Sequence, residues 1–226
     1  MTLFRTVDEL LRGTHTKPEN LQKGEIDLDT GRLLTAVLVL GMTYGAFMGL
    51  YAVLRGGGDA VRQIGAATLK VPLLFVLTLL VTFPSLYVFS ALSQSRLTFQ
   101  MTLRLLLAAI AVNMALLASF GPVTGFFTLS TESYPFMIVL NVAFFAVSGA
   151  VGLGFLRKAL AGVFDGALAP GRNVFRVWIL IYAVVGAQMG WILRPFIGDP
   201  NRPFQLFRER QGNFFVAVWD AFWHLF

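Results

Sequence analysis

The sequence predicts an all-α integral membrane protein: a polytopic transmembrane bundle of five helices, with an amphipathic helix at each terminus and an irregular exoplasmic cap. Hydrophobic residues make up 56% of the 226 residues and charged residues only 13%, which is about half the charged share of a soluble domain. Mean hydropathy is +0.70. The apolar residues also gather in five long runs that contain no Asp, Glu, Lys, Arg or His. These observations disfavour a soluble enzyme, a secreted disulfide scaffold and a disordered chain.

Each of the five apolar runs approaches the length that crosses a bilayer. A helix needs about 20 apolar residues to span a hydrocarbon core of roughly 30 Å. The runs form a transmembrane domain over 33–193, and they cover 33–54, 71–92, 105–127, 137–156 and 177–193. The last run has 17 residues and is the shortest. The first run follows a charged segment and is too long for the apolar core of a signal peptide, so we expect it to be a span.

The distribution of basic residues predicts the orientation. Eleven Lys and Arg lie in the N-terminal tail and in the loops after the second and fourth runs, against seven on the other side. The loop 128–136 carries Glu132 and no basic residue. The positive-inside rule therefore favours a cytoplasmic N-terminus and an exoplasmic C-terminus. The net charge of +6 is scattered over tails and loops, so the lipid bilayer is the expected partner and nucleic acid is not.

Both terminal segments, 1–32 and 194–226, contain a short amphipathic stretch. Near the N-terminus, apolar residues recur at helical spacing: Leu3, Val7, Leu10 and Leu11. Opposite charges stand four residues apart on the other side, pairing Arg5 with Glu9 and Asp8 with Arg12. The pattern predicts a helix that lies in the membrane interface or, equally well, packs on a partner. Residues 13–32 read as a polar linker.

At the C-terminus the pattern is aromatic. The apolar stripe comprises Phe215, Val218, Trp219, Phe222, Trp223 and Phe226. About 13 residues cannot span a bilayer, and Trp prefers the headgroup region. We expect a surface-lying or partner-docked helix with Trp219, Phe222 and Trp223 as interfacial anchors. His224 is expected to be a solvated or capping group.

Small residues form ladders on three of the runs. Helices in lipid associate through close backbone approach, because lipid tails are as apolar as their side chains. The ladder glycines are Gly41, Gly45, Gly49, Gly149, Gly152, Gly186 and Gly190. They predict either packing within the five-helix bundle or a face for another membrane subunit.

A few polar residues lie at membrane depth. Asn113, Asn141 and Gln188 are the costliest to desolvate, so each needs a partner. Hydrogen bonds between helices would supply one, and a shared polar path is the alternative. Pro84 removes a backbone donor near the centre of the run 71–92, where it predicts a kink.

The residues that intramembrane chemistry requires are missing. The runs hold no acid or His, and the chain has no Cys. Intramembrane proteolysis, proton-coupled transport through a titratable group and haem ligation by facing His are therefore disfavoured. There is no GxxxxGK[ST] loop, and the triplet 56–58 reads as a flexible turn. We predict no enzyme activity, no catalytic residue, no cofactor and no metal.

The stretch after the fifth run is the most distinctive. Residues 194–215 combine Arg, Pro and Phe in a composition that fits neither disorder nor a helix. We expect an ordered, irregular cap on the exoplasmic end, either a structural lid or a docking platform or anion site. Asp199 could cap a turn, and Arg194 or Arg202 could pair with Asp199 or Glu209. The charged cap residues are Arg194, Asp199, Arg202, Arg208, Glu209 and Arg210.

Two blocks carry a resemblance to a known group. They read LKVPLLFVLTLLVTFPSLYVF over 69–89 and QMGWILRPFIGDPNRPFQLFRERQGNFF over 188–215. With the order of the five runs, they resemble a group of bacterial polytopic proteins that is loosely similar to the Yip1-like membrane families. The resemblance covers about 33–215 and implies a five-helix bundle in the bacterial inner membrane with a cytoplasmic N-terminus. It supplies no catalytic residue.

Two hypotheses for function follow. The leading one is a non-catalytic membrane subunit or scaffold that assembles with other membrane proteins or with itself. The alternative is a transporter or channel component whose polar path is lined by Asn113, Asn141 and Gln188.

Overall fold

The chain folds into α-helices throughout the part that the computed structural model describes, which comprises residues 3–12, 29–55, 59–92, 98–164, 170–199, 202–209 and 212–223. These ranges hold seven helices and no strand. Two are short, α1 (Leu3–Leu11) and α8 (Phe214–Trp223). Five are long: α3 (Thr30–Arg55), α4 (Ala60–Leu92), α5 (Phe99–Ser130), α6 (Tyr134–Phe164) and α7 (Pro170–Leu193). The predicted all-α class is confirmed.

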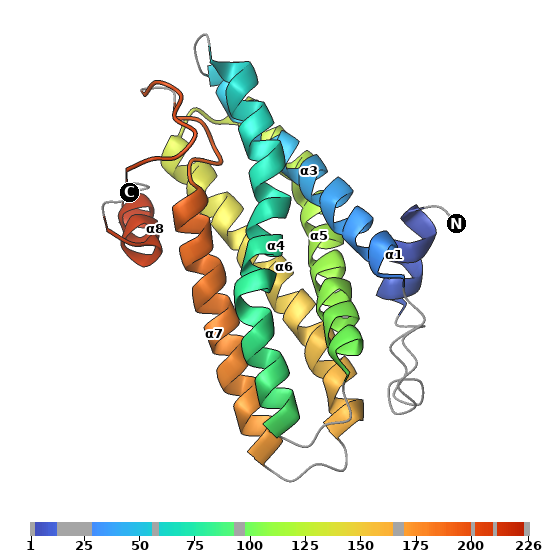
Figure 1. The fold of residues 1–226 in the computed structure, drawn as a ribbon. Coiled ribbons are helices and arrows are strands. Elements are labelled where there is room, and N and C mark those ends of the chain that lie inside the picture. Colours follow the sequence, from blue (N-terminus) through green and yellow to red (C-terminus); the bar gives the residue numbers. More distant parts are fainter. Residues whose placement is uncertain are drawn as a thin grey trace.

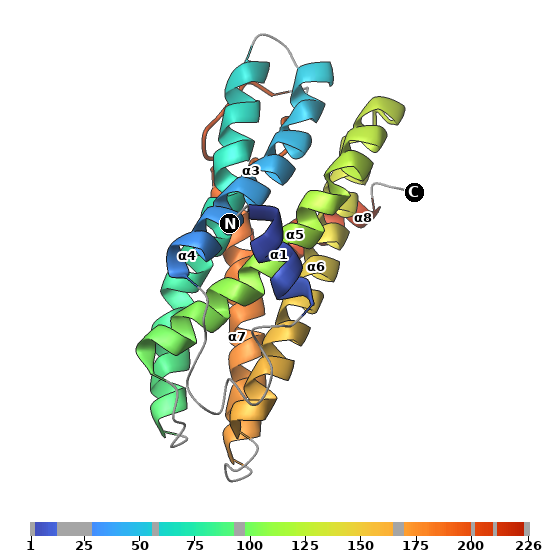
Figure 2. The same ribbon diagram turned by 90° about the vertical axis from the view of Figure 1, so that its right-hand side faces the viewer.

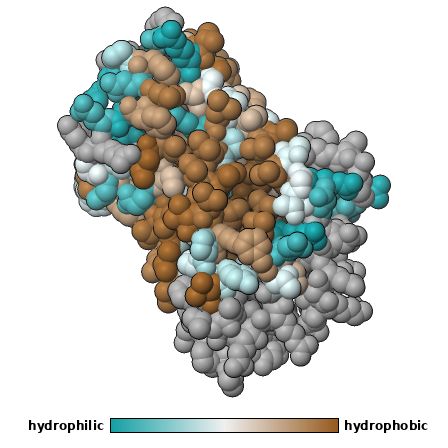
Figure 3. Space-filling model, in the orientation of Figure 1, coloured by the Kyte–Doolittle hydropathy of each residue, from teal (hydrophilic) through white to brown (hydrophobic). Residues whose placement is uncertain are grey.

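Four of the long helices, α3 to α6, are long and apolar enough to cross a membrane, with windows of mean hydropathy between 1.9 and 2.2. The protein is therefore a multi-pass integral membrane protein. The apolar part of α7, Val177–Leu193, falls in a shorter class, so the predicted count of five spans is not reached on this measure. In the view of Figure 3, hydrophobic residues form a broad belt between polar residues at the upper left and at the right.

Successive long helices run in opposite directions, and α3, α5 and α7 finish toward the same end of the bundle (Figure 1). We call this the cap end. Helix α3 packs extensively on both α4 and α5, α6 packs on α5, and α7 packs on α4. Helices α6 and α7 touch only briefly. The bundle is thus a ring that is weakly closed between α6 and α7.

Helix α5 is the centre of the core. Every residue from Leu105 to Met114 is buried, on all faces of the helix. A helix that is apolar all round is typical of a protein core or of a membrane span. Here α1, α3, α4 and α6 contact it.

Several helices begin earlier than predicted. Helix α4 starts at Ala60 and not at 71, so Arg62 and Lys70 belong to the helix and not to a loop. Arg104 likewise lies inside α5. An apolar run marks only the part of a helix that sits in hydrocarbon, and basic side chains with good helix propensity extend it beyond.

Helix α4 is continuous through Pro84, where a kink is predicted. Proline frees backbone groups that neighbours must satisfy. Close to it, the Thr82 carbonyl accepts hydrogen bonds from the Ser85 hydroxyl (2.7 Å) and from Nε1 of Trp178 on α7 (3.2 Å). The proline thus sits where α7 docks on α4.

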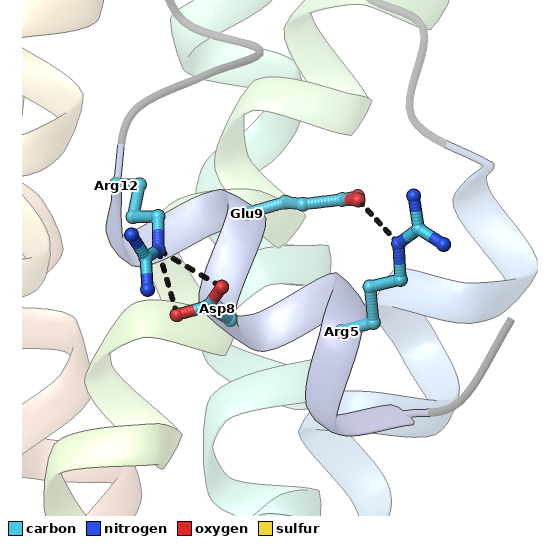
Figure 4. A network of polar contacts seen from close by, with 4 residues as sticks. All are labelled: Arg5, Asp8, Glu9 and Arg12. Carbon is cyan, nitrogen blue, oxygen red and sulfur yellow. Dashed lines mark hydrogen bonds and ion pairs between the residues drawn. The ribbon is translucent and has the colours of Figure 1, made fainter.

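Helix α1 packs on α3 and α5 of its own chain (Figure 2). Leu10 is buried in this contact, whereas Leu11 of the predicted stripe is exposed. On the outer side, Arg5 Nε donates to Glu9 (2.9 Å), and Arg12 Nε to both carboxylate oxygens of Asp8 (2.9 Å each), as Figure 4 shows. The ion pairs predicted from the spacing are confirmed. The apolar side of α1 packs on α3 and α5 of the same chain.

Helix α8 contacts α6 and α7. Asn213 Oδ1 accepts a hydrogen bond from the Val216 amide (3.1 Å) and so caps the first turn. The predicted stripe points outward, since these of its side chains are exposed: Phe215, Trp219, Phe222 and Trp223. Phe226, His224, His15, the linker residues 13–28 and the triplet 56–58 lie outside the described residues.

The predicted glycine ladders all face helices of the same chain. A Cβ added at Gly45 would lie 2.5 Å from the Ala67 carbonyl oxygen, and one at Gly49 would lie 2.7 Å from Ile64 Cα, both on α4. Gly41 also faces α4, Gly149 and Gly152 face α5, and Gly186 and Gly190 face α4. The sequence predicted either packing within the bundle or a face for another subunit. The structure shows contacts within the bundle.

Sequence reasoning missed a further pair on α5. A Cβ at Gly121 would lie 2.4 Å from Phe47 Cδ2, and one at Gly125 would lie 3.2 Å from Phe47 Cδ1. These glycines form a recess in α5 for an aromatic ring of α3. The four-residue spacing of Gly121 and Gly125 was the available signal.

We predict that Gly45→Ala destabilises the protein by about 1–3 kcal/mol, because the new methyl group meets a backbone carbonyl that cannot move alone. Thermal unfolding in one detergent, followed by Trp fluorescence, measures the loss. Gly65→Ala on α4 is the matched control, because a Cβ there meets nothing within 4 Å. An equal loss in both variants would contradict the packing described here.

Candidate functional site

An irregular segment follows α7 and lies over the cap end of the bundle (Figures 1 and 2). We call residues 194–199 and 202–209 the cap segment. Pro195 and Pro203 exclude a regular helix. The backbone at Gly198 is seated between α3 and α4, because a Cβ there would lie 2.5 Å from Ala52 Cβ and 2.9 Å from Gln63 Cγ. Pro195 and Ile197 are buried in the same contact.

Lys70 of α4 fastens the cap segment. Its side chain is only 3% exposed. Its Nζ donates to the carbonyl oxygens of Pro195 (3.1 Å) and Leu206, and it lies 5.1 Å from the ring centroid of Phe207. One ammonium group therefore connects the two described parts of the cap segment, 194–199 and 202–209. Hydrogen bonds from a charged donor are stronger than neutral ones, and the ring face adds a cation–π contribution.

Two neutral side chains add further fastenings. Gln63 Nε2 donates to the carbonyl oxygens of Phe196 (3.0 Å) and Pro195 (3.4 Å). The Tyr134 hydroxyl donates to the carbonyl of Ile197 (3.4 Å). The cap segment forms few hydrogen bonds of regular secondary structure, so side chains of α4 and α6 satisfy its backbone.

Asp199 is the ionic centre of the cap segment. It forms an ion pair with Arg208 (3.3 Å), with side chains only 13% and 17% exposed, and a second one with the more exposed Arg202 (3.6 Å). The Arg202 amide also donates to the Asp199 carbonyl (3.2 Å) across the predicted turn. Pro200 and Asn201 within this turn lie outside the described residues. The predicted pairing of Arg202 with Asp199 is present, and the more buried pairing with Arg208 was not foreseen.

Arg194 holds the other side of the segment. Its guanidinium carbon lies 3.3 Å from the ring centroid of Trp191, and its Nη2 donates to the Glu209 carbonyl (2.6 Å). The Arg194 carbonyl accepts the Arg208 amide (3.3 Å). The predicted partner was Asp199 or Glu209, whereas the contact uses the backbone carbonyl of Glu209. Arg210 lies outside the described residues.

A separate contact joins α3 to the turn between α5 and α6. The Tyr51 hydroxyl donates to the Glu132 carbonyl (2.7 Å), and Arg55 pairs with the Glu132 carboxylate (2.7 Å). The Glu132 side chain is 84% exposed, so this ion pair contributes little, about 0–1 kcal/mol. The pair of Asp199 with Arg208 is far better shielded, and the removal of one partner there leaves a poorly solvated charge.

The three predicted intramembrane amides lie in different contacts. Asn141 Oδ1 accepts the Tyr44 hydroxyl (2.7 Å), and its Nδ2 donates to the Met137 carbonyl (2.7 Å). Asn113 lies on α5 against Gly149 and Gly152 of α6. Gln188 is half-buried on α7. Asn141 is thus paired within the α3–α6 contact.

The cap segment also has an exposed outer edge. The described residues contain no group of three His, Cys, Asp or Glu that could hold a metal ion. The outer edge of the cap segment exposes Arg202, Leu206 and Phe207. A surface that mixes a cation with apolar side chains suits recognition of a protein or of a membrane surface.

Sequence analysis located the cap residues but missed the anchors on α4. Both anchors lie between the first two predicted runs, and the seven-residue spacing of Gln63 and Lys70, which places them on one face of a helix, was the available signal. No family model, curated protein or solved structure matches the chain. The resemblance to the Yip1-like families therefore stays a prediction from the two quoted blocks.

We predict that Lys70→Met loosens the cap segment while the helices remain folded, because Met keeps the length of the side chain but cannot donate to Pro195 and Leu206. A cost of about 1–2 kcal/mol corresponds to an increase of about 5- to 30-fold in tryptic cleavage after Arg208. Trypsin does not cut the bond after Arg202, because Pro203 follows it. Arg62→Met, an exposed change on the same helix, is the control and should leave the cleavage rate unchanged. Equal rates in the two variants would show that Lys70 does not fasten the segment.

Proposed function

We propose that this protein is a non-catalytic integral membrane subunit or scaffold, which assembles with other membrane proteins or with itself through the cap segment. The observation that carries the proposal is the number of anchors on an irregular segment. Ordering a residue costs about 1–2 kcal/mol of backbone entropy, and here Lys70, Gln63, Tyr134 and Asp199 offset that cost. A shape maintained in this way outside the helices suits a docking platform.

The packing of the glycine ladders supports a scaffold that assembles through the cap segment and α8. These glycines face helices of the same chain, which supports an assembly surface elsewhere on the protein. The cap segment offers Arg202, Leu206 and Phe207, and α8 offers Trp219 and Trp223. Aromatic and Arg side chains are the residues enriched in binding hot spots.

The transporter alternative has less support. A polar path needs its groups aligned, and Asn141 is already paired with Tyr44 and Met137. Asn113 and Gln188 lie on helices α5 and α7, which have no substantial contact with each other.

The proposed topology has five spans, a cytoplasmic N-terminus and an exoplasmic cap, in a bacterial inner membrane. Helix α7 has 24 residues, about 36 Å at 1.5 Å per residue, which suffices to cross. It runs in the same direction as α3 and α5 (Figure 1). The excess of basic residues on the side of the N-terminus supports the orientation.

Photo-crosslinking tests the assembly. A photoreactive phenylalanine at Phe207 should crosslink, in native membranes, to a second copy or to a stoichiometric membrane protein identified by mass spectrometry. The same residue at Leu129, which is exposed on α5, is the control and should not. A protein that is monomeric in native mass spectrometry and silent at both positions would refute the scaffold.

Cysteine labelling tests the topology, since the chain has no Cys of its own. In intact cells, a membrane-impermeant maleimide should label Gln205→Cys in the cap segment, whereas Asp29→Cys before α3 should react only after permeabilisation. Both positions are exposed. Labelling of both in the same compartment would overturn the five-span arrangement.

A further inference from the structure

A small cavity lies where α5, α6 and α7 meet, in the weakly closed part of the ring. Its volume is about 20 Å³. Asn113 of α5 lines it, together with Gly149 and Gly152 of α6 and Trp178 and Tyr182 of α7. This cavity is separate from the cap segment.

Asn113 brings an unpartnered polar atom to the cavity. The residue is only 5% exposed, and its Oδ1 is buried with no hydrogen-bond donor within reach among the described residues. Asn141 offers the contrast, because both ends of its amide are bonded to protein groups. A buried amide oxygen that lacks a donor carries a large desolvation cost, so a small donor bound beside Asn113 Oδ1 would lower the free energy of the folded protein.

The walls define the size and chemistry of that donor. Helix α6 approaches closely, since a Cβ at Gly152 would lie 2.9 Å from the Ala109 carbonyl oxygen and 3.1 Å from Asn113 Cβ. The indole of Trp178 is already committed to Thr82 (3.2 Å). A water molecule needs roughly 10–15 Å³ and two or more polar partners. Besides Trp178, the lining residues with polar side-chain atoms are Asn113 and Tyr182.

We propose that one water molecule binds in this cavity and donates a hydrogen bond to Asn113 Oδ1. A volume of about 20 Å³ accommodates one water molecule. Water links α5 to α7 at a level where these helices lack direct packing. The inference is independent of the proposed assembly through the cap segment.

Solution NMR of the full-length protein in lipid nanodiscs, with ¹⁵N-labelled Asn, tests the site. The side-chain amide of Asn113, assigned by its loss in Asn113→Gln, should show a cross-relaxation peak with water. The side-chain amide of Asn141 is the internal control and should show none, because protein groups satisfy it.

Two glycine variants on α6 locate the water. In Gly149→Ala the new methyl group would lie 3.9 Å from Asn113 Nδ2 without a clash, so it occupies the cavity, and the water peak of Asn113 should disappear. Gly154→Ala is the matched control, because a Cβ there meets nothing within 4 Å, and the peak should persist.

Three results would overturn the proposal. One is the absence of a water peak at Asn113 in the unmodified protein. Another is a peak to lipid acyl protons in its place, which would show that a lipid chain fills the cavity. The third is an Asn113 water peak that survives Gly149→Ala as well as it survives Gly154→Ala.

Discussion

The close approach of α3 to α4 is the contact on which the rest of the structure depends. Lipid gives two apolar helices no hydrophobic reason to associate, so contact requires side chains small enough for the backbones to meet. Gly45 and Gly49 satisfy this condition against Ala67 and Ile64. Since α3 also packs on α5, the same approach positions both halves of the ring. It also creates the seat between α3 and α4 into which the cap backbone fits at Gly198.

The cap segment shows how charge is accommodated at the end of such a bundle. The Lys70 ammonium donates to two backbone carbonyl oxygens and lies over a ring face. Its charge therefore stabilises the backbone of the cap segment through these contacts. Asp199 pairs with two arginines, which offsets part of the positive charge around it. Burial strengthens these interactions and raises the cost of breaking them. The exposed pair of Arg55 with Glu132 has the shorter distance but contributes less, because water screens it.

The polar side chains of the interior form hydrogen bonds between different pairs of helices. Asn141 ties α6 to α3 through Tyr44, and Trp178 ties α7 to α4 through Thr82. Asn113 lines a cavity of about 20 Å³. Separate polar contacts of this kind hold helices together where lipid cannot. Outside the long helices, the cap segment exposes Arg202 and Phe207, and α8 exposes Trp219 and Trp223.

The sequence by itself determined the class, the positions of the long helices and both terminal helices. The reason is that run length relative to bilayer thickness, and spacing along a helix, are properties of neighbours in the chain. The Arg5 and Arg12 pairs followed from a four-residue spacing for the same reason. Only the tertiary structure decided which polar residues act together. Lys70 bonds to residues 125 and 136 positions away, and Gly198 meets Ala52. Such contacts depend on how helices cross and where a loop folds back. The pattern of apolar residues along the chain does not contain this information. Gln63 and Lys70 precede the apolar run 71–92, so their contacts with the cap segment were not predicted.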